Sequence, residues 1–153
     1  MLLSRAHACL STPTTPEIGL FDGIGPLEGA RALVIGHGAL EVVCGLIRRG
    51  CTAATEFPAC GRVAPEADSV DVVIVPGAGS LSEAQRAIEL AARALMLGGR
   101  IAVRYTPGGS APGIAALMRA YGFGAVRTRP TPAGTVLTAE RPIFGPLHRG
   151  GQC

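Results

Sequence analysis

The sequence predicts an α/β protein in which helices cover both faces of a mostly parallel sheet, giving three layers. Apolar runs of strand length alternate with segments of helical period between residues 30 and 122, and glycine turns separate them. This alternation is typical of parallel sheets with right-handed crossovers. The last two apolar runs, 123–128 and 135–140, flank a turn that contains proline and glycine. They predict an antiparallel hairpin at the C-terminal end.

The composition is that of one globular domain. Of the 153 residues, 48% are hydrophobic and 16% are charged, so the chain can form a core and is not disordered. Its net charge of +3 comes from scattered arginines. Because no basic stripe with stacking aromatic residues occurs, we expect no nucleic-acid partner. No run approaches the roughly 20 apolar residues of a membrane span, so we expect no membrane partner.

The cysteines predict no metal site. There are five of them, an odd number, and their spacing contains neither a Cys-x-x-Cys pair nor another zinc motif. We therefore expect reduced thiols, no metal ion and a cytoplasmic protein. Cys44 falls within a helical period and should be buried as a small apolar residue.

The chain divides into three parts. Residues 1–29 form an N-terminal arm and lead-in, residues 30–142 the α/β domain, and residues 143–153 a tail. The first 16 residues end in Ser-Thr-Pro-Thr-Thr-Pro, which continues neither a helix nor a strand. The apolar residues that follow predict that the segment 17–29 lies over the first strand.

One unit organises the domain. It contains a buried strand, a glycine turn, a helix and a second short strand, at residues 32–35, 36–38, 39–49 and 51–57. Glu56 follows Gly36 by about 20 residues. In nucleotide-binding α/β units, an acid at that distance binds the ribose hydroxyls.

The rest of the domain predicts two further strand–helix units before the hairpin. Ser80 and Glu83 form a capping box at the start of the first helix, which should end at Gly98-Gly99. A minimal extra strand is possible at residues 62–64. The expected strands are 70–76 and 100–105, and the second helix begins near Ser110 and ends at Gly122.

Three glycine turns follow strands: Gly36-His37-Gly38, Gly77-Ala78-Gly79 and Gly108-Gly109. At the carboxyl edge of one parallel sheet, they would line the crevice where such folds bind ligands. The alternative is that short strand-to-helix turns use glycine for its conformational freedom alone. His37 either contacts a ligand or acts as a base, or it is an ordinary loop histidine.

Residues 30–142 resemble the class I S-adenosylmethionine-dependent methyltransferases, a Rossmann-like family. The matching pieces occur in the family's order: the first glycine turn, the acid after strand two, the strand 70–76, the passage 94–104 and Tyr121-Gly-Phe123 before the hairpin. The resemblance implies S-adenosylmethionine as the cofactor and assigns no catalytic residue. It implies close approach of the methionine part to the backbone at Gly36 and Gly38, contacts with ribose at Glu56 and with adenine at Asp68, and a wall beside the sulfonium at Pro76 and Gly77. His37, between the two glycines, is a further candidate for a cofactor contact.

The sequence also departs from the family pattern. Val34 replaces the usual acid before the first glycine, and Leu40 stands where a third glycine is expected. The 13 residues between Glu56 and Val70 leave no room for the usual third strand and its helix. Strand 51–57 should then be a sheet edge, which we expect to be covered by the N-terminal arm or to pair in a homo-oligomer.

Two functions remain open from these observations. The first is a methyltransferase that acts on a small molecule or a protein. The second is an inactive subunit with this fold that serves as an oligomerisation or interaction module. A dinucleotide oxidoreductase is disfavoured because Glu41 stands where Gly-x-Gly-x-x-Gly needs glycine, and a serine hydrolase because no Gly-x-Ser-x-Gly elbow occurs.

Overall fold

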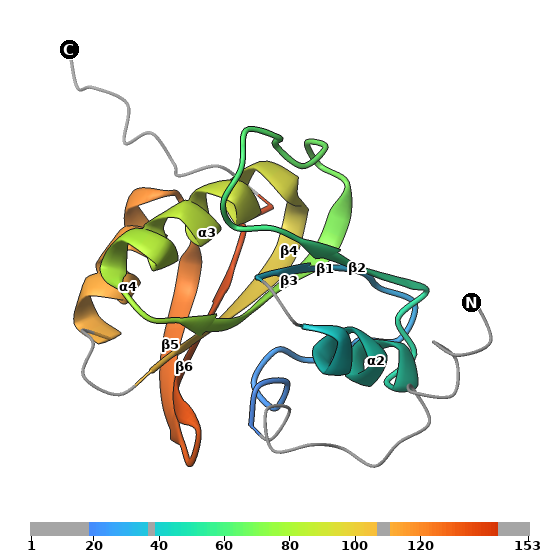
Figure 1. Cartoon of the computed structure of the whole chain (residues 1–153), viewed down its shortest axis with the longest axis horizontal. Helices are drawn as coiled ribbons and strands as arrows, with labels where there is room; N and C mark the ends of the chain where they lie inside the picture. Colours follow the sequence, from blue (N-terminus) through green and yellow to red (C-terminus); the bar gives the residue numbers. More distant parts are fainter. Residues whose placement is uncertain (1–18, 37–38, 107–110, 144–153) are drawn as a thin grey trace.

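A computed structural model describes residues 19–36, 39–106 and 111–143 of the chain. Figure 1 shows a central sheet with helices on both faces. Several predicted features lie outside the described residues: His37, Gly38, the third glycine turn at 108–109, the first 16 residues and most of the C-terminal tail.

One six-stranded sheet forms the centre of the molecule, in the order β2-β1-β3-β4-β6-β5. The first four strands of the chain run parallel, whereas β6 is antiparallel to both of its neighbours, β4 and β5. The predicted fold class and the C-terminal hairpin are therefore confirmed. The strands are β1 (Arg31–Ile35), β2 (Ala53–Phe57), β3 (Val70–Ala78), β4 (Leu95–Tyr105), β5 (Gly124–Thr131) and β6 (Gly134–Glu140).

Strand β2 is an edge of this sheet. It pairs with β1, and β1 pairs on its other side with β3. The segment between Phe57 and Val70 contains only bends, turns and irregular chain, so the minimal strand at 62–64 does not form. The third strand of the family pattern is missing, as the short spacing predicts.

Three helices of the described chain cover the two faces. Helix α2 (Leu40–Arg48) lies on one face, and α3 (Leu81–Ala94) and α4 (Ala111–Ala120) lie on the other (Figure 1). Side chains of a strand alternate between faces, so each face has its own core. In β3, Val72 and Ile74 belong to the core beneath α2, and Val73 and Val75 to the core beneath α3. An unbroken apolar run of this kind is what a doubly covered strand requires.

The lead-in segment shares the face of α2. Its apolar side chains are buried in the core beneath α2, together with residues of β1. The guanidinium of Arg100 in β4 also holds it, because Nη1 donates to the carbonyl oxygen of Ile24 at 2.5 Å and Nη2 to that of Pro26 at 2.6 Å. The segment lies over β1 as predicted and is part of the domain core. The buried residues are Leu20, Phe21, Ile24 and Leu27.

The Gly98-Gly99 pair lies inside β4 and does not end a helix. Helix α3 stops at Ala94, and Leu95 already pairs with Val70. Leu95 is fully buried in the core, so the chain joins the sheet immediately after the helix. The register shifts before Arg100, and Gly98 adopts a φ of +80° there. The glycines therefore serve a bulge, whereas the sequence predicted a helix end.

The cysteines differ from expectation in one respect. Cys44 is 2% exposed, as predicted, but it is disulfide-bonded, so the expectation of reduced thiols is wrong for this residue. Cys51 and Cys60 are not in disulfides. None of the helices in the described ranges has the length and apolar character to cross a membrane.

Candidate functional site

A cavity of about 420 Å³ opens at the carboxyl ends of β1 and β3, beside the first turns of α3. We call it the strand-tip cavity. Its volume lies within the range of roughly 300–1,000 Å³ that is usual for small-molecule sites. Its lining comes from both strand tips, from the loop after β2 and from α3: Ile35, Gly36, Ala59, Cys60, Val75, Gly77, Ser82, Glu83, Arg86 and Ala87.

Gly36 forms part of the floor of this cavity. Its φ of +150° lies in the region that favours glycine. Its N–H donates to the carbonyl oxygen of Phe57 at 2.9 Å, which joins the tips of β1 and β2. A Cβ atom at this position would lie 3.8 Å from Cδ of Pro76, so Pro76 is the neighbour on the side of β3. The structure thus brings Gly36, Pro76 and Gly77 to one place.

Gly77 exposes its backbone to the cavity. An added Cβ atom would meet nothing within 4 Å, so the glycine faces open space. The following turn is held by the start of α3. Glu83 N–H donates to Oγ of Ser80 at 3.2 Å, and Oε2 of Glu83 accepts from the N–H of Gly79 at 2.9 Å. The predicted cap at Ser80 is confirmed, and it fixes the wall next to Gly77.

Sequence reasoning missed most of the walls. The loop after β2 contributes Ala59 and Cys60, and Nη2 of Arg86 in α3 donates to the carbonyl oxygen of Gly61 at 3.4 Å. Arg86 also pairs with Glu89 at 3.6 Å, but both side chains are about half exposed, so this ion pair contributes little to stability. Ser82 and Arg86 are four residues apart, and this helical spacing was the only signal in the sequence that they share a face.

Glu56 also lies near the carboxyl ends of the parallel strands, in β2, but it does not line the cavity. It is exposed, and its register partner in β1 is Val34, which belongs to the core beneath α2. Side chains of paired residues point to the same face of a sheet. The carboxylate is therefore on the α2 side, whereas the cavity is on the α3 side.

Asp68 lies at the opposite end of the strands, next to the amino end of β3. It precedes β3, whose other end carries Gly77, and its carboxylate accepts from Nη1 of Arg141 at 2.8 Å. The structure does not bring Asp68 to the strand-tip cavity. Leu40, which stands where the family pattern has a third glycine, is 47% exposed and does not line the cavity either.

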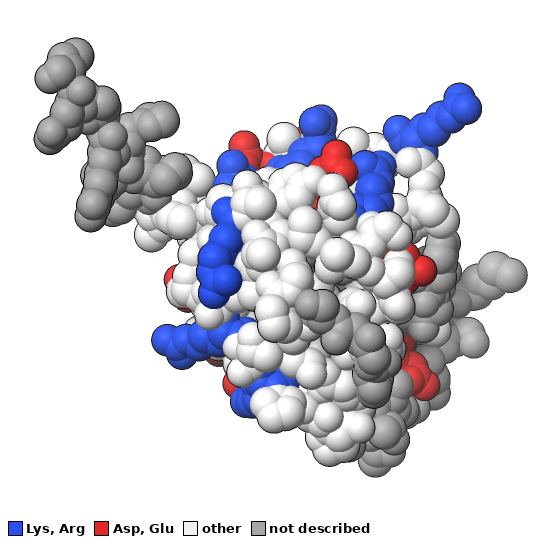
Figure 2. Space-filling model, turned by 90° about the vertical axis from the view of Figure 1, so that its left-hand side faces the viewer, with Lys and Arg blue, Asp and Glu red and all other residues white. Residues whose placement is uncertain are grey.

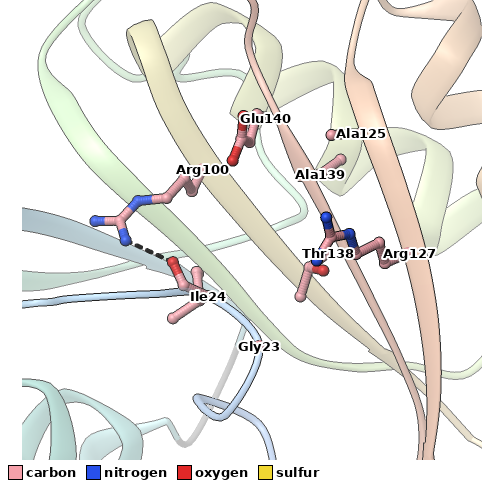
Figure 3. A pocket seen from close by; sticks show the side chains of 8 residues that line it. All are labelled: Gly23, Ile24, Arg100, Ala125, Arg127, Thr138, Ala139 and Glu140. Carbon is pink, nitrogen blue, oxygen red and sulfur yellow. Dashed lines mark hydrogen bonds between the residues drawn. The ribbon is translucent and has the colours of Figure 1, made fainter.

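Two other cavities are less suitable for a nucleoside. One is about 90 Å³ and lies on the α2 side, between the lead-in segment and strands β4, β5 and β6. Figure 3 shows that Arg100 in its wall points away from Arg127 and toward Ile24. The other is about 420 Å³ but lies near Asp71 and Gly98, at the amino end of β3, whereas α/β folds bind ligands at the carboxyl ends. Within the described ranges, no three potential metal ligands come together.

Burial changes the pKa of one arginine near the carboxyl edge of the sheet. Arg104, close to the end of β4, is 5% exposed, and desolvation lowers the pKa of its guanidinium. Its neighbour two positions earlier, Ala102, belongs to the core beneath α2, so this side chain is on the face opposite the strand-tip cavity.

Comparisons with known proteins give a result for structure and none for sequence. No protein-family model matches the chain, and no curated protein is significantly similar to it. The structure "PigF with SAH" is 16% identical with a TM-score of 0.54, covering 73% of this chain and 50% of PigF. An S-adenosylmethionine-dependent methyltransferase from Mesorhizobium loti is 10% identical with a TM-score of 0.60. The match covers 77% of this chain and 94% of the Mesorhizobium protein. A TehB-like methyltransferase from Corynebacterium glutamicum is 14% identical with a TM-score of 0.58. The match covers 92% of this chain and 95% of the Corynebacterium protein.

These similarities confirm the resemblance at the level of the fold. The chain has the Rossmann-like fold of the class I S-adenosylmethionine-dependent methyltransferases, with the third strand absent. It spans half the length of PigF and nearly the whole length of the other two proteins.

Proposed function

We propose that this protein binds S-adenosylmethionine in the strand-tip cavity and transfers its methyl group to a small molecule or a protein. One observation carries the proposal: Gly36 and Gly77 leave the backbone open at two neighbouring strand tips, on the floor of a cavity of about 420 Å³. The fold supports it, because a structural neighbour, PigF, was solved with SAH.

In this proposal, the two glycines admit the cofactor close to the strand tips. The Ser82 hydroxyl and the Arg86 guanidinium offer hydrogen bonds from the α3 wall, and the apolar side chains of Ile35 and Val75 lie beneath. The Glu83 carboxylate already accepts from Gly79 and steadies the turn. The cofactor contacts expected at His37 and Gly38 remain predictions. The position of Glu56 on the α2 side argues against the ribose contact that the resemblance implies, and substitution of Glu56 tests it.

The bound cofactor would supply an electrophilic methyl group on its sulfonium. The protein then has to hold a nucleophilic acceptor in line with that methyl group, and such positioning needs little acid–base help. The loop at residues 58–61, which Arg86 holds against α3, closes one side of the cavity.

Calorimetric titration with S-adenosylhomocysteine tests the proposal. We expect saturable binding at one site and much weaker binding of adenosine, which lacks the amino-acid part. Absence of heat with both S-adenosylmethionine and S-adenosylhomocysteine would overturn it. The fold would then favour the second function, a subunit that acts as an interaction module.

We also propose that β2 pairs with β2 of a second copy. It is an edge strand with Thr55 and Glu56 exposed, and exposed edges are seldom left unpaired. Antiparallel pairing centred on Thr55 would set Glu56 opposite Ala54 of the partner subunit, so no two carboxylates would face each other. This surface would serve either the enzyme or the inactive subunit.

The charge distribution supports an acceptor other than nucleic acid. Figure 2 shows one face on which the basic side chains lie apart, around a broad uncharged area. Cytoplasmic location is the remaining part of the proposal. Cys51 and Cys60, which are not in disulfides, fit that compartment, whereas the disulfide bond of Cys44 would be unusual there.

A further inference from the structure

The cavity of about 90 Å³ on the α2 side of the sheet is separate from the strand-tip cavity. We call it the hairpin cavity. The lead-in segment forms one wall, at Gly23 and Ile24, and strands β4, β5 and β6 form the rest. A water molecule takes roughly 30 Å³ in the liquid, so the hairpin cavity has room for a molecule of a few heavy atoms and not for a nucleoside.

Three polar side chains line this cavity from the hairpin. Thr138 and Glu140 of β6 are the register partners of Ala102 and Arg100 in β4, and Ala102 belongs to the core beneath α2. Because paired residues point to the same face of a sheet, Thr138 and Glu140 are on the α2 side. Arg127 of β5 pairs with Thr138 and is therefore on this side too. In Figure 3, Arg127 lies beside Thr138, whereas Glu140 lies nearer to Arg100.

A β-bulge brings Arg127 to the cavity. Between the pair made by Gly124 and the pair made by Arg127, β5 has two residues where β6 has one. Without the extra residue, Arg127 would be opposite Leu137, which belongs to the core beneath α3. The bulge includes Ala125, whose φ of +53° lies in a region that disfavours a side chain. Bulges commonly redirect a side chain beside a functional site, and this one turns a guanidinium toward the hairpin cavity.

The polar groups of the cavity do not satisfy one another. Within residues 19–36, 39–106 and 111–143, the side chains of Arg127, Thr138 and Glu140 make no hydrogen bond or ion pair. The guanidinium of Arg100 is held by the lead-in segment, because it donates to two carbonyl oxygens there. The hairpin cavity thus offers a guanidinium and a hydroxyl at one place and a carboxylate at another.

We propose that the hairpin cavity binds a small α-amino acid. The carboxylate of this ligand accepts from the Arg127 guanidinium and the Thr138 hydroxyl, and its ammonium group donates to the Glu140 carboxylate. A zwitterion matches both charges, whereas Glu140 would repel an oxyanion and Arg127 would repel a simple cation. The volume favours glycine or alanine over larger amino acids. The site is on the other face of the sheet from the proposed cofactor cavity and does not depend on the cofactor.

Nuclear magnetic resonance titration of the isotope-labelled full chain tests this proposal, with L-alanine as the probe. We expect saturable shifts of the amide signals of Gly23, Ala125 and Thr138 and no shift at Gly77. Propionate and ethylammonium each keep one of the two charges of alanine, and each should bind at least about tenfold more weakly. Absence of saturable shifts with L-alanine, shifts confined to other residues, or equally tight binding of propionate or ethylammonium would overturn the proposal.

Matched variants test the two charges. Arg127→Met and Glu140→Gln should each weaken L-alanine binding about tenfold or more, through loss of a charged hydrogen bond. Both side chains are exposed, so the melting temperature should change little. Arg119→Met on α4 and Glu66→Gln in the loop after β2 remove the same charges elsewhere and should leave binding unchanged. Unchanged binding in either cavity variant, or an equal loss in its matched control, would contradict the roles of Arg127 and Glu140.

Discussion

Gly36 is hydrogen-bonded to Phe57 at the tips of two parallel strands, with 2.9 Å between the nitrogen and the carbonyl oxygen. This bond fixes the point at which β1 leaves the sheet, and the φ of +150° at Gly36 turns the chain there. Gly77 of β3 lies on the other side of the same cavity. The floor of the proposed cofactor site is therefore backbone, and its shape depends on two residues that lack side chains.

The two glycines should respond differently to substitution. A Cβ atom at position 77 would have no neighbouring atom within 4 Å. We therefore expect Gly77→Leu to change the free energy of unfolding by less than about 1 kcal/mol. The new side chain would occupy the cavity and weaken binding of S-adenosylhomocysteine at least about tenfold, or 1.4 kcal/mol. Calorimetry and urea unfolding measure the two effects.

Gly36→Ala should instead destabilise the fold by about 1–2 kcal/mol, because its backbone lies in a region that disfavours a side chain. Ala120→Leu, on the exposed end of α4, is the control for added bulk. Binding that survives intact in Gly77→Leu would place the cofactor elsewhere.

Arg86 and Glu56 make a second contrast. Arg86 lines the cavity, so Arg86→Met, which keeps the apolar stem, should weaken S-adenosylhomocysteine binding about tenfold through loss of a charged hydrogen-bond donor. Glu56 is on the other face of the sheet, and Glu56→Gln should change binding less than about threefold. A tenfold loss with Glu56→Gln would support the ribose contact that the family resemblance implies.

A single added charge tests the proposed pairing of two copies through β2. Thr55→Lys would set two lysines opposite each other in an antiparallel pair centred on this residue, and like charges directly opposite destabilise such pairs. We expect a dimer in the wild-type protein and a monomer in the variant by light scattering. Thr128→Lys, on the other edge strand β5, should remain dimeric. A wild-type protein that is monomeric at high concentration would refute pairing through β2.

Cys51 should make stability sensitive to alkaline pH. Burial is the largest influence and raises the pKa of its thiol, although the charge of Arg100 acts in the opposite direction. The unfolded thiol ionises first, so the contribution of Cys51 is fully present below about pH 8.5 and is lost as the pH rises through the folded pKa. Urea unfolding at a series of pH values should show this decline in the wild-type protein. A Cys51→Ala variant with the same alkaline decline would show that another group causes it.

The sequence predicted those features that depend on neighbouring residues. The run from Val72 to Val75 indicated a strand buried on both faces, and Ser80 with Glu83 indicated the start of α3, because capping acts over three residues. The short interval after Glu56 correctly indicated a missing strand. These features are local, because each depends only on residues that are close together in the sequence.

Contacts between distant residues could not be predicted in the same way. Arg86 reaches Gly61, 25 positions away, and Asp68 pairs with Arg141 across 73 positions. Neither contact leaves a pattern in the sequence, so the α3 wall was missed and the pairing of Asp68 with Arg141 was not predicted. The face on which Glu56 lies also depended on strand register, which spacing from Gly36 does not reveal.

A crystal structure determined after soaking with S-adenosylhomocysteine would show whether the strand-tip cavity is the cofactor site. We expect density for the nucleoside above Gly36 and Gly77, bounded by Arg86 of α3 and by the loop at residues 58–61. Crystals in which this cavity stays empty at saturating ligand, or in which the nucleoside binds on another face of the sheet, would contradict it.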